Sequence, residues 1–275
     1  MGRRHRACNK RRSIKRGCDS RATFAVPRLK MAPRRKSKGT RRPMVITVNA
    51  YKIAYMALPK AGCSTVKAAL AMVDPDVSLP PPEARDVHAW HRIYPTSRWR
   101  PYRWERCADH WRFCVVRDPL RRLLSVYTNR VVGFGDLHDC RKILRGKVDL
   151  PKDPDPDFFF QNLRRYMRAS SLIKHHALPS WLFLGFDLGS YDRIYRSSEL
   201  GQFGQDLGQR TGRCVPIERE NRSEARLDLE DLAARTQDSI RAYLAEEYDY
   251  LSAFYQNPFS GRRTVPCAAR LRRVS

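Results

Sequence analysis

The stretch that most constrains this chain is Met56-Ala-Leu-Pro-Lys-Ala-Gly-Cys-Ser-Thr-Val-Lys67. It follows an apolar run with β character at 51–58 and precedes a run with helical character at 64–72. The first amides of a helix have no partner within the helix and carry partial positive charge, so an anion binds there readily. A strand, a tight loop of small residues and a helix start therefore predict an anion-binding cradle.

The side chains of this stretch fit that interpretation. Gly62 lets the backbone approach an anion closely, Ser64 and Thr65 add hydroxyl donors, and Lys60 and Lys67 add full charges. The stretch is not a Walker P-loop, because that motif places its lysine directly after the second glycine, whereas Lys60 precedes Gly62. Taken alone, the pattern also fits an ordinary strand–turn–helix with a solvated lysine.

A second stretch favours the functional interpretation. Residues 111–116 read as a buried strand, and Arg117 stands at its end. Asp118 is a candidate N-cap and Pro119 suits the first turn of a helix. The apolar residues that follow have helical spacing: Leu120, Leu123, Leu124 and Tyr127. Ser125 lies eight residues after Arg117, so the two side chains are candidates to contact one anion beside the first cradle.

Together the two stretches resemble the donor-binding motifs of sulfotransferases. Residues 58–67 resemble the loop that binds a 5′-phosphosulfate, and residues 117–125 resemble the 3′-phosphate motif. This pair of motifs is similar to that of the carbohydrate-type branch, the sulfotransferase 2 family, in its bacterial form. The resemblance covers residues from about Val45 to Phe259. Gly62-Cys63 is a mild departure from other members, which carry other small residues there.

The resemblance implies a fold, a reaction and a donor. The expected fold is a three-layer α/β, P-loop-like domain with a central parallel sheet. The expected reaction transfers a sulfuryl group from 3′-phosphoadenosine 5′-phosphosulfate (PAPS) to a hydroxyl, on a carbohydrate acceptor, without a metal. Arg117 and Ser125 would hold the 3′-phosphate, and Lys60 would offset charge on the bridging oxygen. The 5′-phosphosulfate would lie on Ala61, Gly62, Cys63, Ser64 and Thr65.

The segment between the motifs holds candidates for a general base. Prolines at 80–82 break any helix there and predict a loop. The acceptor hydroxyl must lose a proton, and histidine titrates near neutrality, so we favour His88 or His91. Glu83 and Asp86 are the carboxylate alternatives. Four aromatic residues here are candidates to stack on sugar rings or to pack locally: Trp90, Trp99, Tyr102 and Trp104.

The rest of the chain predicts mainly structural elements. We expect a helix at 157–167 capped by Asp157, a strand at 191–196, and helices at 198–207 and 229–254. The resemblance implies that His175 and His176 help to line the acceptor site. They are weaker candidates for metal ligands, because the sequence shows no third ligand beside them. The short segment 221–223 resembles one that lies near the nucleotide in the family.

Charge is unevenly distributed along the 275 residues. Residues 1–43 hold 17 of the 54 Lys and Arg residues and a single acid, Asp19, with almost no apolar periodicity. We expect a disordered basic tail at 1–43, a sulfotransferase domain at 44–257 and a basic C-terminal tail at 258–275. The N-terminal tail is either a nonspecific polyanion-binding arm, the product of a misassigned start before Met31 or Met44, or a dedicated nucleic-acid arm.

The sequence also bears on location and on rival functions. No run of 18 or more apolar residues is present, and the eight cysteines form no C-x-x-C pair, which favours a cytoplasmic protein with reduced thiols. One rival is a P-loop-like ATP-dependent kinase, which would place a lysine and a Ser/Thr at the end of the cradle. The other is a nucleic-acid-binding protein that acts through the basic tail.

Overall fold

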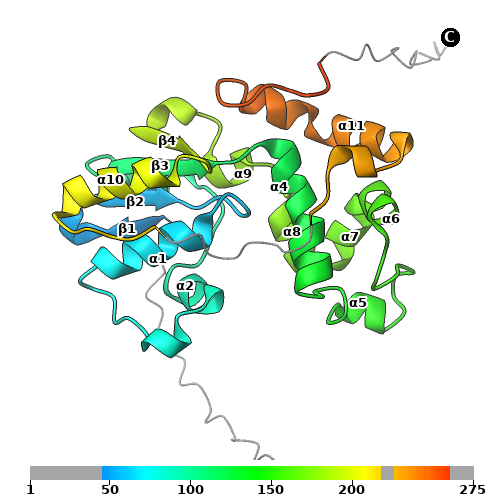
Figure 1. Ribbon diagram of the computed structural model, residues 1–275, viewed down its shortest axis with the longest axis horizontal. Coiled ribbons are helices and arrows are strands. Elements are labelled where there is room, and N and C mark those ends of the chain that lie inside the picture. Colours follow the sequence, from blue (N-terminus) through cyan, green and yellow to red (C-terminus); the bar gives the residue numbers. More distant parts are fainter. Residues whose placement is uncertain (1–44, 218–225, 261–275) are drawn as a thin grey trace, which may run out of the picture. The chain divides into compact units, whose positions relative to one another are not determined.

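The computed structural model of the chain describes residues 45–217 and 226–260 (Figure 1). The predicted tail at 1–43 and the segment 221–223 lie outside these residues, as does most of the predicted C-terminal tail. Phe259, which we placed in that tail, is buried and its ring meets Tyr248 edge-on at 6.3 Å. The packed part of the chain therefore continues at least two residues past the predicted boundary at 257.

The described residues contain one four-stranded sheet in the order β1-β2-β3-β4. The strands are β1 (Ile46–Val48), β2 (Ile53–Met56), β3 (Trp111–Val116) and β4 (Arg193–Arg196). β3 pairs in parallel with β2 and β4, as expected, whereas β1 pairs antiparallel with β2 through a short turn, which we did not predict. The parallel pairs place the carboxyl ends of β2 and β3 side by side, and both predicted motifs begin there.

Alternate residues of the strands join two different core clusters. Ile53 and Tyr55 pack with helices α1 (Cys63–Val73) and α10 (Leu200–Thr211). Ala54 and Met56 pack instead with α9 (Trp181–Leu184). The period-two pattern of a strand explains this division, because successive side chains point to opposite faces of the sheet. Both faces of β2 are therefore buried, which explains its continuous apolar sequence.

A third core cluster lies among helices beside the sheet (Figure 1). It is formed mainly by α4 (Pro119–Val126), α6 (Pro156–Gln161), α7 (Leu163–Ala169), α8 (Ser171–Ala177) and α11 (Ala234–Tyr250). A π-helix, η4 (Tyr127–Gly133), continues α4, and α5 (Arg141–Leu144) follows it. Short 3₁₀ turns occur at Asn49–Tyr51, Pro82–Ala84, Glu105–Cys107, Leu188–Ser190 and Leu229–Asp231.

Two predicted helices are divided in the structure. The helix expected at 157–167 is α6 and α7, and its N-cap is Asp155, whose carboxylate accepts from the Phe158 amide, rather than Asp157. Asp157 instead accepts a hydrogen bond from the amide of Ala233 at 3.0 Å, which helps to fix the start of α11. The helix expected at 229–254 is likewise a 3₁₀ turn followed by α11.

The segment between the motifs is more helical than we predicted. The proline run ends at Pro82, and a helix α2 (Val87–Ile93) begins five residues later. Asp86 caps this helix by accepting from the Ala89 amide at 2.7 Å. His88 and His91 therefore lie one turn apart on one helix rather than on a loop. A short helix α3 (Pro101–Trp104) follows and leads into β3.

Candidate active site

The predicted cradle has the backbone shape that an anion site requires. Lys60 and Gly62 both adopt left-handed conformations, with φ of 66° and 83°, and α1 begins at Cys63. A Cβ on Gly62 would lie 3.2 Å from Leu200 Cδ1, so both the backbone and the space favour glycine there. Left-handed conformations at non-glycine residues concentrate at functional sites, which fits the position of Lys60.

The ammonium of Lys60 is hydrogen-bonded to a residue that the sequence did not single out. Its Nζ donates to Oδ1 of Asn129 at 2.5 Å. Burial lowers the pKa of Lys60 to about 7, with nearby Arg117 and Arg130 acting in the same direction and Cys63 opposing. An anion bound beside this ammonium would favour its charged form and raise that pKa again.

Arg117 joins the second motif to the first. Its Nη1 donates to the main-chain carbonyl of Lys60 at 3.0 Å, so the end of β3 is tied to the loop after β2. As predicted, Asp118 caps α4 by accepting from the amide of Arg121 at 2.8 Å, and Pro119 is the first residue of that helix. The strand–cap–helix interpretation of the second motif is confirmed.

Ser125 is not joined to Arg117 by any hydrogen bond that the described residues show. It is buried in α4, and its hydroxyl donates to the carbonyl of Arg122 at 2.7 Å, one turn earlier in the same helix. To donate to a phosphate, this hydroxyl must rotate away from that carbonyl. Ser125 is thus at the predicted place in the helix, with its proton directed elsewhere.

A histidine of α2 contacts the start of α1 in the cradle. His91 of α2 contacts Oγ of Ser64 through Nε2 at 3.2 Å and Nζ of Lys67 through Nδ1 at 3.0 Å. Burial, then Lys67, then His175 lower the pKa of His91 to about 3. His88 is exposed and meets Phe134 edge-on at 6.0 Å. The structure thus brings His91 to the cradle and leaves His88 nearer the solvent.

His175 and His176 belong to α8. Burial lowers the pKa of both rings, that of His176 to about 2, and the charge of Arg130 acts in the same direction on each. His176 Nδ1 is buried without a hydrogen-bond partner. In the parts of the chain that the structure describes, no three His, Cys, Asp or Glu side chains are grouped so that they would hold a metal ion.

Comparison with known protein families identifies the family of this chain. A family model described as "Sulfotransferase family" matches residues 43–253, which include both motifs and all four of these histidines. The chain belongs to the sulfotransferase family. No curated protein and no solved structure matches the chain.

This sulfotransferase uses a π-helix that our sequence analysis missed. The η4 helix begins where α4 ends and supplies Asn129, the partner of Lys60, together with Arg130. Arg130 pairs with Asp136 at 2.6 Å and lies over the ring of Phe134 at 4.6 Å. An extra residue per turn departs from the 3.6-residue period, so hydrophobic spacing gives no signal for it; π-helices occur often at functional sites.

A buried ion pair fixes α4 within the sulfotransferase. Arg122 Nη2 lies 2.8 Å from Glu247 Oε1, and both side chains are almost completely buried. Arg122 also donates to the carbonyls of His176 and Leu178 at 3.2 and 3.0 Å, and Ser180 donates to Glu247 at 2.5 Å. The network ties the helix of the second motif to α11 and to the end of α8, which carries the second histidine pair.

The aromatic residues after α2 have mixed roles. Trp90 and Trp104 are 1% and 3% exposed, so of the two alternatives that the sequence left open they take local packing in the core. Trp99 is half-buried, and its ring packs against Gly185, where a Cβ would lie within 2.7 Å of it. Tyr102 is 56% exposed. Of the four, Tyr102 alone presents most of its ring to solvent.

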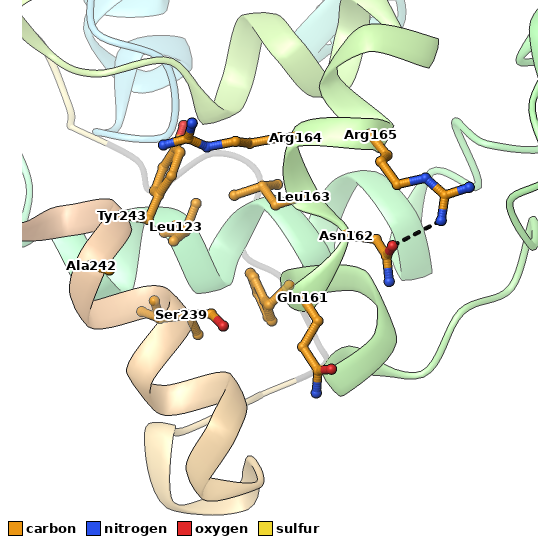
Figure 2. A pocket seen from close by; sticks show the side chains of 11 residues that line it. Leu123, Gln161, Asn162, Leu163, Arg164, Arg165, Ser239, Ala242 and Tyr243 are labelled. Atoms are coloured by element: carbon orange, nitrogen blue, oxygen red, sulfur yellow. Dashed lines mark hydrogen bonds between the residues drawn. The ribbon is translucent and has the colours of Figure 1, made fainter. Parts of the chain in front are cut away.

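A cavity of about 260 Å³ lies apart from these residues, among α4, α6, α7 and α11 (Figure 2). Apolar and aromatic side chains such as Leu123, Phe160 and Tyr243 line it together with polar and charged ones, including Arg164 and Arg165. None of the cradle residues or the four histidines lines it. The cradle therefore remains the candidate active site, and this cavity is separate from it. Among the described helices, none has the length and apolar character needed to cross a bilayer.

Proposed function

We propose that this sulfotransferase uses PAPS as its donor and transfers the sulfuryl group to a hydroxyl of a carbohydrate. The observation that carries the proposal is the hydrogen bond from Arg117 to the carbonyl of Lys60, because it makes the two predicted donor motifs one continuous site. The core clusters on the two faces of the sheet support the three-layer, P-loop-like arrangement that the family resemblance implies.

The cradle has the chemistry to hold the 5′-phosphosulfate end of PAPS. The first amides of α1, at Cys63, Ser64 and Thr65, have the positive end of the helix dipole behind them. The left-handed Gly62 has no side chain to obstruct the approach of an anion. Arg117, and Ser125 after rotation of its hydroxyl, would hold the 3′-phosphate, which distinguishes PAPS from ATP.

Lys60 is suited to stabilise the transition state. PAPS supplies an activated sulfuryl group, and negative charge grows on the bridging oxygen as its bond to sulfur breaks. Lys60 is held in place by Asn129 before any ligand arrives, so little reorganisation is needed at the moment of reaction. Lys60 and Arg117 supply the positive charge that the reaction requires, and no metal enters the proposal.

Removal of the acceptor proton falls to His88 in this proposal. Both ring nitrogens of His91 are engaged, by Ser64 and by Lys67, whereas His88 lies one turn away with an exposed ring. Of the carboxylate alternatives, Asp86 is occupied as the N-cap of α2, and Glu83 is exposed in the preceding 3₁₀ turn.

The acceptor would bind beside η4. Phe134 is 41% exposed, His88 meets its ring edge-on, and Arg130 lies over it. An exposed aromatic face next to hydrogen-bonding side chains suits the apolar face and hydroxyls of a sugar ring. Val132 in η4 is a second exposed apolar side chain, 54% exposed.

The rival functions fit the site less well. A P-loop kinase would need a lysine followed by Ser or Thr at the end of the cradle, whereas Lys60 precedes Gly62 and Lys67 turns inward toward His91. A nucleic-acid function would rest on the tail at 1–43, which lies outside the described residues, whereas the cradle lies within them. Contact between that tail and polyanions remains compatible with sulfuryl transfer.

The proposal is tested by incubating the full chain with PAPS labelled in its sulfuryl group and a panel of mono- and oligosaccharides. We expect label in at least one saccharide, and roughly 10²–10³-fold slower labelling when Lys60→Ala replaces the native protein. Parallel reactions with ATP labelled in its γ-phosphate should transfer nothing. Transfer from ATP and not from PAPS would replace the proposal with the kinase.

A further inference from the structure

Lys67 is a lysine that the proposed reaction does not use, and its side chain is completely buried in α1. A buried ammonium is costly unless its protons are hydrogen-bonded. Lys67 Nζ donates to Oγ1 of Thr96 at 2.5 Å and lies 3.0 Å from Nδ1 of His91. Its charge is therefore directed away from solvent and onto one ring nitrogen of a histidine at the cradle.

The contact with Lys67 sets the tautomer of His91. An ammonium group only donates, so Nδ1 of His91 must accept. A neutral imidazole has one accepting and one donating nitrogen, which leaves the ring proton on Nε2. Nε2 lies 3.2 Å from Oγ of Ser64, so His91 donates to the serine hydroxyl.

The surroundings of His91 keep its ring neutral. Burial is the main cause of its lowered pKa, and the charged and titratable groups with the largest effect on that pKa act in the same direction. These groups come from four elements: Lys67 of α1, His88 of α2, Arg130 of η4 and His175 of α8. In an imidazolium, the proton on Nδ1 would also face the ammonium protons of Lys67, and the two positive groups would repel each other.

Ser64 has one hydroxyl proton, and accepting from His91 leaves that proton to point elsewhere. Ser64 is the second residue of α1, where the helix amides also point to the cradle. We propose that Lys67 is a positioning residue that acts through His91 to direct the hydroxyl proton of Ser64 toward the anion bound in the cradle. Only the identity of that anion, the phosphosulfate of PAPS, rests on the proposed function.

The tautomer is measured directly on the native full chain, without ligand and without any variant. Long-range ¹H–¹⁵N correlation spectra at pH 7 distinguish a protonated from an unprotonated ring nitrogen, and the signals of His91 are those that disappear in His91→Gln. We expect a protonated Nε2 and an unprotonated Nδ1. A protonated Nδ1, an imidazolium, or an average of both tautomers would overturn the proposal.

A double-mutant cycle tests whether Lys67 acts through His91. Calorimetric titration gives the Kd of PAPS for the native chain, Lys67→Met, His91→Ala and the double variant. We expect Lys67→Met to raise the Kd about tenfold, the scale of one hydrogen bond near an anion. The double variant should bind no more weakly than His91→Ala. Additive losses would overturn the proposal, because a purely structural lysine acts independently of His91.

Two further variants sharpen the cycle. In His91→Gln the side-chain NH₂ can donate to Ser64 whether or not Lys67 is present. The Kd of PAPS should therefore be lower for His91→Gln than for His91→Ala. Adding Lys67→Met to His91→Gln should then raise the Kd only slightly. Lys152→Met, at an exposed lysine, is the matched control and should leave the Kd unchanged. Should the native chain bind no PAPS, the proposed donor is wrong, while the tautomer measurement still decides the role of Lys67.

Discussion

The guanidinium of Arg117 donates a hydrogen bond to the main-chain carbonyl of Lys60 at 3.0 Å. Arg117 ends β3 and Lys60 follows β2, and these strands are parallel neighbours in the sheet. Sites in α/β proteins form where the carboxyl ends of parallel strands meet, and this contact joins the two sequence motifs at that edge of the sheet. It also orients the left-handed turn that leads into α1.

Lys60→Ala should lower kcat by roughly 10²–10³-fold, the scale of removing one group that stabilises transition-state charge. PAPS binding should weaken less, because the amides of the cradle remain. Steady-state kinetics with the labelled donor give both quantities. Lys152→Ala, at an exposed lysine, should behave like the native chain. Near-native turnover by Lys60→Ala would remove Lys60 from the mechanism.

PAPS affinity should fall as pH rises through about 7, because Lys60, with its pKa lowered to about 7 by burial, loses its proton in the free enzyme. The bound anion favours the charged lysine, so the Kd should rise toward tenfold per pH unit above that value. Calorimetry from pH 6 to 9 measures this. Lys60→Arg, which stays charged, should flatten the profile, and an equal slope in both proteins would assign it to another group.

Glu247→Ala should destabilise the fold by about 3–5 kcal/mol, because it leaves Arg122 buried and uncompensated. Urea unfolding measures the change, and Glu246→Ala, at the exposed neighbouring position, should cost little. Arg122→Met combined with Glu247→Leu should recover part of the loss, since no unpaired charge remains. An equal effect of Glu247→Ala and Glu246→Ala would mean that the buried pair does not hold α4 against α11.

Deletion of residues 1–43 should leave the Tm and the sulfuryl-transfer rate unchanged. The deleted sequence has almost no apolar periodicity, and the buried core of the described residues begins at Val45. Retention on a polyanion column should fall, because 17 basic residues are removed. A truncated chain that melts well below the full chain would place the boundary of the domain further toward the N-terminus.

Local sequence rules predicted much of the fold where the signal is short-range. The strand at 111–116 and the cap at Asp118 agree with the structure, because an apolar β run followed by Asp-Pro has few alternatives. The same Asp-Pro rule, applied to Asp155 and Pro156, would have placed the start of α6 correctly. The antiparallel β1 was missed although it lies only a short turn before β2, because a strand of three residues is too short to show an alternating pattern.

The candidate site was predictable only in part, because the partners of its residues lie on other elements of the fold. The cradle residues and Arg117 come from recognisable motifs, and His91 came from its position after the cradle. The hydrogen-bond partners of these residues lie on other elements. The partner of Lys60 is Asn129 in the π-helix, and one partner of His91 is Lys67 in α1. Neither partner follows from spacing, since each depends on how separate helices pack.

The most direct test of PAPS as the donor compares its affinity with that of adenosine 5′-phosphosulfate, which lacks the 3′-phosphate. Calorimetric titration of the native chain and Arg117→Ala with both nucleotides measures the contact. A guanidinium–phosphate interaction is worth roughly 1.5–3 kcal/mol, so Arg117→Ala should weaken PAPS about 10- to 150-fold and the shorter nucleotide much less.

Ser125→Ala should weaken PAPS less than Arg117→Ala does, because its hydroxyl must first leave the Arg122 carbonyl. Arg141→Ala, at an exposed arginine, is the control and should change neither affinity. Our account predicts a loss in Arg117→Ala that is specific to the nucleotide with the 3′-phosphate. Equal losses for the two nucleotides would contradict the account and leave nothing in this site that selects PAPS over ATP.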